Sequence, residues 1–278
     1  MSGERYDCVV IGGGPAGSIA AVYLARFCRK VLLVDAERSR ARWIPRTRNI
    51  PAYPDGLEGA ELLARLRAQV DRYAIERVAA RATVLEGACG DFQVHAEHRS
   101  WQAERVLLAS GVGDRMPEHL EQLWTLVRGG EVRLCPVCDA FELRGKRIGL
   151  IAEDAQAEHE ERFLRTYSPQ LSVFAPADVV EVLTTDAGVT VRRRSGDWVT
   201  CDALYVGLGV DVGSELAAPL GARRDAQGYL AVDQRQQTSV PGLYAAGDVV
   251  QSLSQISVAF GQAAIAASAI NLSLIAGR

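Results

Sequence analysis

Residues 6–35 read YDCVVIGGGPAGSIAAVYLARFCRKVLLVD and contain the motif that decides the fold. An unbroken apolar run ends at Gly12-x-Gly14-x-x-Gly17, an Ala-rich stretch follows, and a second apolar run ends at Asp35. Unbroken apolar strands are typical of a parallel sheet that is covered on both faces. The order predicts a strand, a tight glycine turn, a helix and a parallel strand, which together form a βαβ unit.

Each position of this motif has a physical role in binding a dinucleotide. Gly12 makes the tight turn, Gly14 lets a pyrophosphate approach the backbone, and Gly17 lets the helix pack closely on the strand. Free amides at the helix N-terminus favour the phosphate charge, and Asp35 is placed to accept hydrogen bonds from a ribose. A glycine-rich turn that binds no ligand is the alternative, and the surrounding strand, helix and acid favour the dinucleotide.

The middle of the chain predicts a second α/β block after the glycine-rich break at residues 111–113. A strand, a helix and another strand are expected over 147–152, 156–165 and 171–174. Further strands follow: residues 179–194 and 197–208 are expected to form β-ribbons, and residues 242–246 a buried strand ahead of the final helix.

This order of elements predicts one domain inserted into another. The expected fold class is α/β, with two Rossmann-like dinucleotide-binding domains, the second inserted into the first. Residues 1–113 and 232–278 are expected to form the first domain, and residues 114–231 the inserted one.

Composition excludes several classes of protein. The chain has 278 residues, 48% of them hydrophobic, and 31 basic residues against 34 acidic ones. It therefore has enough apolar residues for a folded core, and no excess positive charge that would attract nucleic acid or anionic lipid. The residues ahead of the first strand contain no basic, apolar leader, so a cytoplasmic location is expected.

The apolar segment 256–276 is long enough to span a bilayer. Gln262, Ser268 and Asn271 interrupt it, and Ala and Gly outnumber Leu. A buried helix of a large α/β domain is therefore expected rather than a membrane anchor.

A second motif, Tyr244-Ala-Ala-Gly247-Asp248, ends a predicted buried strand. Taken alone, it is equally consistent with an ordinary turn that has a capping Asp. Combined with the N-terminal glycine motif, it resembles the second flavin motif of flavoproteins with two dinucleotide-binding domains, and it favours FAD over NAD.

Two of the six cysteines stand close together in the stretch Cys135-Pro-Val-Cys138-Asp139. Thiols at this spacing can close a small disulfide, and the adjacent Asp can move a proton during thiol exchange. Half of a zinc site, completed by His95 and His98, is the alternative. We favour the disulfide and expect no metal, because a second Cys-x-x-Cys is absent from the sequence.

The sequence resembles the low-molecular-weight thioredoxin reductases over nearly its whole length. The segments VVIGGGPAGSIAA, ERVLLASGVG, CPVCDAFELRGKRIGLI and VPGLYAAGDVVQSLSQISVAFGQAAIAA occur in the order that this family shows. The resemblance implies that Cys138 faces the flavin, Cys135 exchanges with a partner disulfide and Asp139 transfers protons. The residues that it implies for FAD binding are Gly12, Gly14, Pro15, Ala16, Gly17, Asp35, Asn49, Gly111, Gly247, Asp248, Gln255 and Ile256.

The chain departs from this family where the family binds NADPH. The glycine-rich turn is replaced by Ala152-Glu153-Asp154-Ala155, and the next strand ends in FAPAD (174–178) without the expected arginines. A carboxylate about 4 Å from a phosphate at a protein surface is repelled by about 4 kcal/mol. The sequence therefore predicts that NADPH is not used in the usual way, with binding through an atypical turn as the alternative.

An arginine-rich stretch also replaces a glycine-rich family segment after Asp35. Its arginines face either the FAD phosphates or an acidic partner, or they belong to a solvated loop. They are Arg38, Arg40, Arg42, Arg46 and Arg48.

These features predict an FAD-dependent disulfide/dithiol oxidoreductase of thioredoxin reductase type, which exchanges electrons between flavin and the Cys135/Cys138 pair. The expected partners are a thioredoxin-like protein or a small-molecule dithiol or disulfide, with ferredoxin or another donor in place of NADPH. A small-molecule dithiol oxidase that uses oxygen and a non-catalytic or regulatory flavoprotein are the alternatives. The final helix is expected to form a homodimer as in the family, although its small residues also suit packing within one chain.

Overall fold

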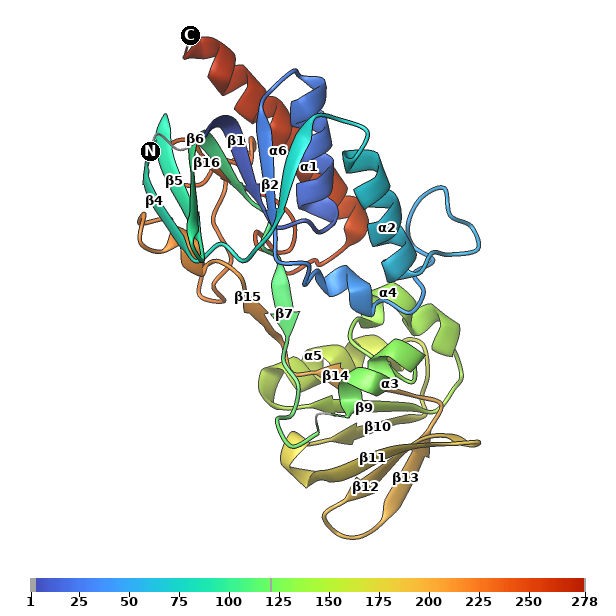
Figure 1. Cartoon of the computed structure of the whole chain (residues 1–278). Helices are drawn as coiled ribbons and strands as arrows, with labels where there is room; N and C mark the ends of the chain where they lie inside the picture. Colours follow the sequence, from blue (N-terminus) through green and yellow to red (C-terminus); the bar gives the residue numbers. More distant parts are fainter. Residues whose placement is uncertain (1–3, 121, 278) are drawn as a thin grey trace. The chain divides into compact units, whose positions relative to one another are not determined.

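The computed structural model describes residues 4–120 and 122–277, except for the side chains of residues 154–156. Backbone contacts divide the chain into two compact units. Figure 1 shows the chain, coloured from the N-terminus to the C-terminus. Unit 1 contains Met1–Arg42, Ala60–Gly113 and Val212–Arg278. Unit 2 contains Trp43–Gly59 and Asp114–Asp211.

Unit 1 is built on a seven-stranded sheet. Its five parallel strands are β3 (Ile75–Ala79), β2 (Val31–Asp35), β1 (Arg5–Ile11), β6 (Arg99–Leu108) and β16 (Leu243–Ala245). Strands β5 (Asp91–Ala96) and β4 (Val84–Ala88) continue the sheet from β6 in antiparallel pairs. Strand β1 is buried along most of its length, as its unbroken apolar sequence predicts.

In the described residues of unit 1 the helices are α1 (Pro15–Arg26), α2 (Gly59–Val70) and α6 (Ile256–Ala276). Helices α1 and α6 pack against each other, and small residues of both lie in one core cluster with β1 and β2. By length and composition α6 could cross a membrane. In this fold its apolar character serves the core, where Ala263, Ala266 and Ile270 are fully buried.

Unit 2 contains a parallel sheet in the order β10 (Leu171–Phe174), β9 (Ile148–Ala152), β14 (Ala203–Gly207) and β8 (Val132–Arg133). A separate antiparallel sheet is formed by β11 (Val179–Thr185), β12 (Gly188–Arg193) and β13 (Trp198–Cys201). The helices are α3 (Leu123–Gly129), α4 (Pro136–Asp139) and α5 (Asp154–Arg165). The short 3-10 turns η2 (Ala140–Leu143) and η3 (Pro176–Asp178) lie in unit 2. The 3-10 turn η4 (Glu215–Ala217) lies in unit 1, and η1 (Arg40–Trp43) spans the chain boundary between the units.

Two of the four chain crossings between the units run through one small ribbon. Strand β7 (Val112–Asp114) leads out of unit 1, strand β15 (Val210–Val212) leads back, and the two strands pair with each other. Each unit therefore contains helices and a sheet built on parallel strands, which confirms the predicted α/β class.

The contact units differ from the expected domains in two places. The chain returns to unit 1 at Val212 rather than near residue 232, and Leu230 already donates a backbone hydrogen bond to Val249 (2.9 Å). Residues 43–59 group with unit 2, where Trp43 stacks on Trp124 with ring centroids 4.7 Å apart. Neither feature has a local sequence signal, because both depend on contacts between distant residues.

One predicted element was assigned to the wrong sheet. Residues 203–207 were expected in a β-ribbon, but β14 is an interior parallel strand between β9 and β8. All five of its residues are buried, which explains its continuous apolar sequence.

Candidate functional site

The glycine turn after β1 is built by close backbone contacts. Gly12 has φ +106°, and a Cβ there would lie 2.3 Å from the Ala109 carbonyl oxygen. A Cβ on Gly17 would lie 1.8 Å from the Gly12 carbonyl oxygen. Because real Cβ atoms do not approach backbone oxygen so closely, both positions require glycine in this turn.

The turn presents the start of α1 without a side chain that would block it. Gly14 is the N-cap residue and provides no capping side chain, and Pro15 begins the helix. The amides of the first helical turn have no acceptor within the helix, and this turn contains no acidic residue. Its geometry and charge therefore fit a phosphate group.

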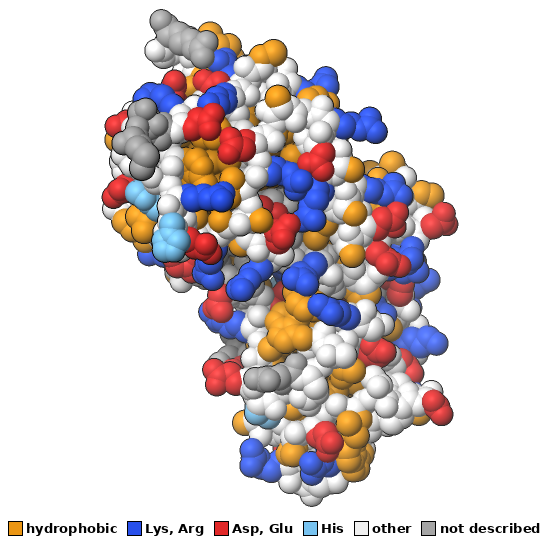
Figure 2. All heavy atoms as spheres, viewed as in Figure 1, with side chains coloured by type: hydrophobic (Ala, Val, Ile, Leu, Met, Phe, Trp, Pro, Cys, Tyr) orange, Lys and Arg blue, Asp and Glu red, His pale blue; other side chains and the backbone are white. Residues whose placement is uncertain are grey.

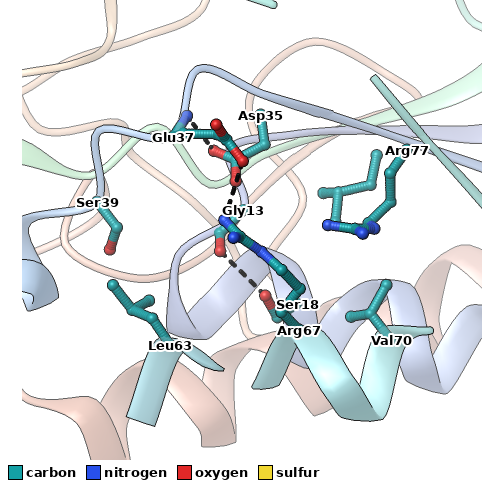
Figure 3. A pocket seen from close by; sticks show the side chains of 10 residues that line it. Gly13, Ser18, Asp35, Glu37, Ser39, Leu63, Arg67, Val70 and Arg77 are labelled. Atoms are coloured by element: carbon teal, nitrogen blue, oxygen red, sulfur yellow. Dashed lines mark hydrogen bonds and ion pairs between the residues drawn. The ribbon is translucent and has the colours of Figure 1, made fainter. Parts of the chain in front are cut away.

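Asp35 lies beside the same turn in a small pocket of unit 1 (Figure 3). Its Oδ2 occupies the space next to Gly13, 2.1 Å from where a Cβ would stand, and its Oδ1 accepts the Glu37 amide (2.9 Å). Figure 3 shows Arg67 reaching from α2 toward Glu37, with which it pairs at 3.0 Å. Arg77 also lines this pocket. The two arginines were not predicted, because α2 and β3 carry no nucleotide motif.

The second motif lies against the first, although the two are far apart in sequence. Ala246, just after β16, donates to the Leu108 carbonyl oxygen of β6 (3.0 Å). Gly247 has φ +86°, and a Cβ there would stand 2.9 Å from the Ala16 Cβ in α1. The amide of Gly247 also donates to Gln262 Oε1 of α6 (2.8 Å). The two predicted FAD motifs therefore lie next to each other in unit 1.

Asp248 faces an arginine from the stretch that was singled out in the sequence. Its Oδ2 lies 3.9 Å from Arg40 Nη1, and the two side chains are 22% and 20% exposed. This contact places one arginine of the run beside the candidate flavin site. By contrast, Arg46 pairs with Glu58 (3.0 Å) and Arg48 with Glu142 (3.7 Å).

The remaining predicted cofactor residues lie in three places. Gly111 has φ +67°, and its carbonyl oxygen accepts the Gly213 amide (2.9 Å). Gln255 is the N-cap of α6 and Ile256 is its first residue, both partly exposed. Asn49 is exposed in segment 43–59, which groups with unit 2, and it accepts a hydrogen bond from Thr47 Oγ1 (2.7 Å).

In unit 2, Cys135 and Cys138 form a disulfide across the start of α4. Their Cα atoms are 5.3 Å apart, and the Cys138 amide donates to the Cys135 carbonyl oxygen (2.9 Å). Both residues are partly exposed. His95, which the alternative zinc site would use, contacts Glu86 in unit 1 (2.9 Å). The described residues contain no group of three or more His, Cys, Asp or Glu suited to a metal.

Asp139 follows the disulfide and is held from two neighbouring strands. Tyr205 of β14 donates its hydroxyl hydrogen to Asp139 Oδ1 (2.5 Å), and Arg133 Nη1 lies 3.5 Å from Oδ2. Burial raises the pKa of Asp139, while Arg133 and Tyr205 act in the opposite direction. Sequence reasoning missed both partners, because only sheet register brings them to this carboxyl group.

The turn between β9 and α5 differs from the glycine turn of unit 1. Glu153 alone separates strand from helix, in extended conformation (φ −141°), and its side chain is exposed. At the end of the adjacent β14, Glu160 of α5 lies so close to Gly207 that a Cβ there would meet its Oε2 at 1.9 Å. Carboxyl groups therefore lie where the sheet of a Rossmann fold receives a nucleotide.

Two arginines nevertheless approach the end of β10. The sequence assigned no function to residues 192–194, but Arg194 Nη2 donates to the Ala177 carbonyl oxygen (3.0 Å) in η3. Arg193 Nε lies 3.7 Å from Asp178, and its Nη1 lies 3.7 Å from Asp197. The charge of Arg193 is therefore already opposed by two carboxylates.

The two Rossmann-like sheets and the Cys-x-x-Cys disulfide define a disulfide oxidoreductase. Residues 6–165 and 168–263 match the family model of pyridine nucleotide-disulphide oxidoreductases, and the chain belongs to this family. It is a thioredoxin reductase-like enzyme, as the sequence resemblance predicts.

Individual relatives agree with this assignment. The thioredoxin reductase of Aquifex aeolicus (strain VF5) is 27% identical over 303 residues, which cover 96% of this chain and 92% of that protein. The crystal structure of HlmI superposes with a TM-score of 0.88 at 26% identity, covering 99% of this chain and 93% of the other. An oxidoreductase from Agrobacterium tumefaciens gives a TM-score of 0.84 at 26% identity, covering 99% and 100% of the two chains.

Proposed function

We propose that the protein exchanges electrons between FAD bound in unit 1 and the Cys135/Cys138 pair of unit 2. The observation that carries this proposal is the disulfide at the start of α4, followed directly by a half-buried and hydrogen-bonded Asp139. A disulfide needs a proton donor when it opens and an acceptor when it closes, and Asp139 supplies both roles.

The residues of unit 1 fit FAD. Gly12, Gly14 and Gly17 with the start of α1 would hold the pyrophosphate, Asp35 the ribose, and Asp248 the ribityl chain. Pro15, Ala16, Gly111, Gly247, Gln255 and Ile256 complete the proposed set in unit 1. Asn49, which the resemblance also implies for FAD, belongs to unit 2. When bound, FAD supplies a carrier that accepts or donates two electrons.

The chemistry at the cysteines is thiol-disulfide exchange. In the reducing direction the Cys135 thiolate attacks one sulfur of the partner disulfide, and the displaced sulfur leaves with a proton from Asp139. Cys138 then displaces the partner from Cys135, so that the internal disulfide re-forms and the partner leaves as a dithiol. A thioredoxin-like protein or a small-molecule disulfide would serve as the partner.

The turn after β9 supports a departure from ordinary NADPH use. Glu153 stands where a glycine turn would let pyrophosphate approach, and a carboxylate repels that phosphate by about 4 kcal/mol at about 4 Å. A ferredoxin or another donor would then feed the flavin, or a dithiol would feed the cysteines. The resulting prediction concerns which reductant bleaches the flavin.

Anaerobic protein with bound FAD should bleach with dithionite and with dithiothreitol, but not rapidly with NADPH or NADH at micromolar concentration. Stopped-flow absorbance of the flavin band measures this directly. Dithionite shows that the flavin is reducible, and dithiothreitol tests the route through the cysteines. Fast, saturable bleaching by micromolar NADPH would show that the Glu153 turn binds the cofactor after all.

The same turn favours a second candidate, oxidation of a small-molecule dithiol at the expense of oxygen. In that direction Cys135 and Cys138 would oxidise a dithiol to its disulfide, bound FAD would supply the two-electron carrier, and oxygen would be reduced to hydrogen peroxide. Equal amounts of disulfide and peroxide from an added dithiol in air, without NADPH, would support the oxidase. Thioredoxin reduction fed by a ferredoxin would support the reductase.

We also propose a cytoplasmic homodimer. Helix α6 exposes Ile265 (46%), Leu272 (60%) and Ile275 (57%), which are apolar residues beyond those used in the core of unit 1. On the face shown in Figure 2, Lys and Arg are otherwise interspersed with Asp and Glu. Sedimentation of the wild type should give a dimer, and Leu272→Glu should shift it toward monomer. A monomeric wild type would contradict this proposal.

A further inference from the structure

Sheet register brings two unrelated side chains to the proton-transfer residue of unit 2. Strands β8 and β14 are parallel, and Arg133 and Tyr205 are direct partners in their register. Only one residue separates Arg133 from Cys135 in the sequence, and the short helix α4 follows. Asp139, the last residue of α4, therefore lies close to the same pair of strands. The side chains of Arg133 and Asp139 are 19% and 16% exposed, and Tyr205 is fully buried.

The contacts hold the Asp139 carboxyl group from both sides. Tyr205 donates to Oδ1 at 2.5 Å, while Arg133 Nη1 faces Oδ2 at 3.5 Å and donates to the Asp139 backbone carbonyl at 3.0 Å. Arg133 Nε also donates to the Gly130 carbonyl oxygen (3.4 Å). One guanidinium thus connects the loop before β8, the end of α4 and the carboxyl group.

We propose that Tyr205 and Arg133 are positioning residues that fix the Asp139 carboxyl for proton transfer to and from the redox cysteines. This inference rests on the proposed dithiol function. A merely structural anchor for α4 would need the backbone contact of Arg133 alone. In addition, the Tyr205 hydroxyl contacts one carboxyl oxygen of Asp139 and the Arg133 guanidinium faces the other. These oxygens are the atoms that gain and lose the proton.

The surroundings of Asp139 shift its pKa in opposite directions. Burial is the largest effect and raises its pKa, and Glu142 of η2 raises it further. Arg133 and Tyr205 lower it. Arg48 from segment 43–59 lies 3.7 Å from Glu142 and weakens that repulsion, and Glu160 of α5 lies against Gly207 at the end of β14. Removing either positioning residue should therefore raise the pKa of Asp139.

Reduction of the disulfide by dithiothreitol illustrates how Asp139 would transfer a proton. A dithiothreitol thiolate attacks one sulfur, the Cys135–Cys138 bond breaks, and the leaving cysteine thiolate takes the proton from the Asp139 carboxylic acid. The second dithiothreitol thiol then displaces the first cysteine and leaves as a cyclic disulfide, so the enzyme gains two electrons and two protons. The rate per dithiothreitol thiolate should fall as pH rises through the pKa of Asp139.

The test measures this rate against pH, by trapping and mass analysis of the thiols, in the full-length FAD-bound protein. In Tyr205→Phe and in Arg133→Gln the fall should move upward by about one pH unit, and Arg133→Lys should recover most of the shift. Carbon NMR of labelled Asp139 should report the same displacement. Tyr167→Phe is the matched control, because Tyr167 packs against the same core cluster as Tyr205 and contacts Phe163.

The outcomes separate this inference from the proposed function. If the wild-type disulfide is not reduced by dithiothreitol, or its reduction never reaches the flavin, the proposed function fails. If reduction proceeds and both variants keep the wild-type pH profile and Asp139 titration, the positioning role is wrong. A slower rate with an unshifted profile would also reject it, since that result indicates loss of structure alone.

Discussion

A Cys138→Ser variant should keep its bound FAD and lose disulfide turnover by about 10³-fold or more, because a serine hydroxyl cannot form the internal disulfide. The substitution removes one sulfur from a partly exposed pair in unit 2, whereas the glycine turn and Asp35 lie in unit 1. The variant should therefore lose turnover while its FAD binding stays unchanged. Flavin absorbance after purification measures FAD binding, and reduction of a disulfide by dithionite-reduced enzyme measures turnover.

The complementary variant and a control sharpen this test. Cys135→Ser should also lose turnover, because the thiol that attacks the partner is gone. Cys28→Ser changes a free, exposed thiol in unit 1 and should leave turnover unchanged. Undiminished turnover in Cys138→Ser would remove the proposed role of the pair. A wild type that binds FAD but turns over no disulfide or dithiol would instead support a regulatory flavoprotein.

Gly17→Ala should weaken FAD binding by about 10²-fold. The new Cβ would stand 1.8 Å from the Gly12 carbonyl oxygen, and this neighbour is backbone that cannot rotate away. Forced separation of α1 from the turn costs about 3 kcal/mol, the upper part of the range for overpacking. If that cost falls on the bound state, FAD affinity drops by about 10²-fold. Fluorescence titration with FAD measures this change.

A second glycine provides the control for that substitution. Gly261 lies in α6, where a Cβ would meet nothing within 4 Å, so Gly261→Ala should retain FAD and gain up to about 1 kcal/mol from helix propensity. Thermal unfolding of both variants separates a local effect on the turn from general loss of structure. A yellow Gly17→Ala protein with wild-type FAD affinity would contradict the assigned role of the turn.

Local patterns were sufficient to predict several parts of the molecule. The apolar run, glycine turn and Ala-rich helix of residues 6–35 appear as β1, α1 and β2, and the final apolar segment forms α6. The Cys-x-x-Cys spacing likewise predicted the observed disulfide, since two cysteines three positions apart come within bonding distance when the chain turns between them, as it does at the start of α4. These features succeed because each is encoded within a few consecutive residues.

Other features required contacts between distant residues. Residues 203–207 form an interior parallel strand. The sequence alone predicts a β-ribbon for them, because the strands just before them in the sequence are ribbon strands. Segment 43–59 groups with unit 2 because Trp43 stacks on Trp124 and lies under Arg128, whose guanidinium carbon is 5.1 Å from the Trp43 ring centroid. No pattern of apolar residues within segment 43–59 predicts either contact.

The sequence by itself determined the α/β class, the glycine turn, the redox pair and the family, because backbone conformation and short-range chemistry follow from neighbouring residues. Tertiary structure alone decided which side chains surround those groups: Arg40 beside Asp248, and Arg133 with Tyr205 on Asp139. For Arg133 and Tyr205 the physical reason is strand register, which pairs residues by hydrogen-bond geometry regardless of their distance along the chain. Arg40 and Asp248 lie in a 3-10 turn and in the turn after β16, and only the packing of these distant segments brings them together.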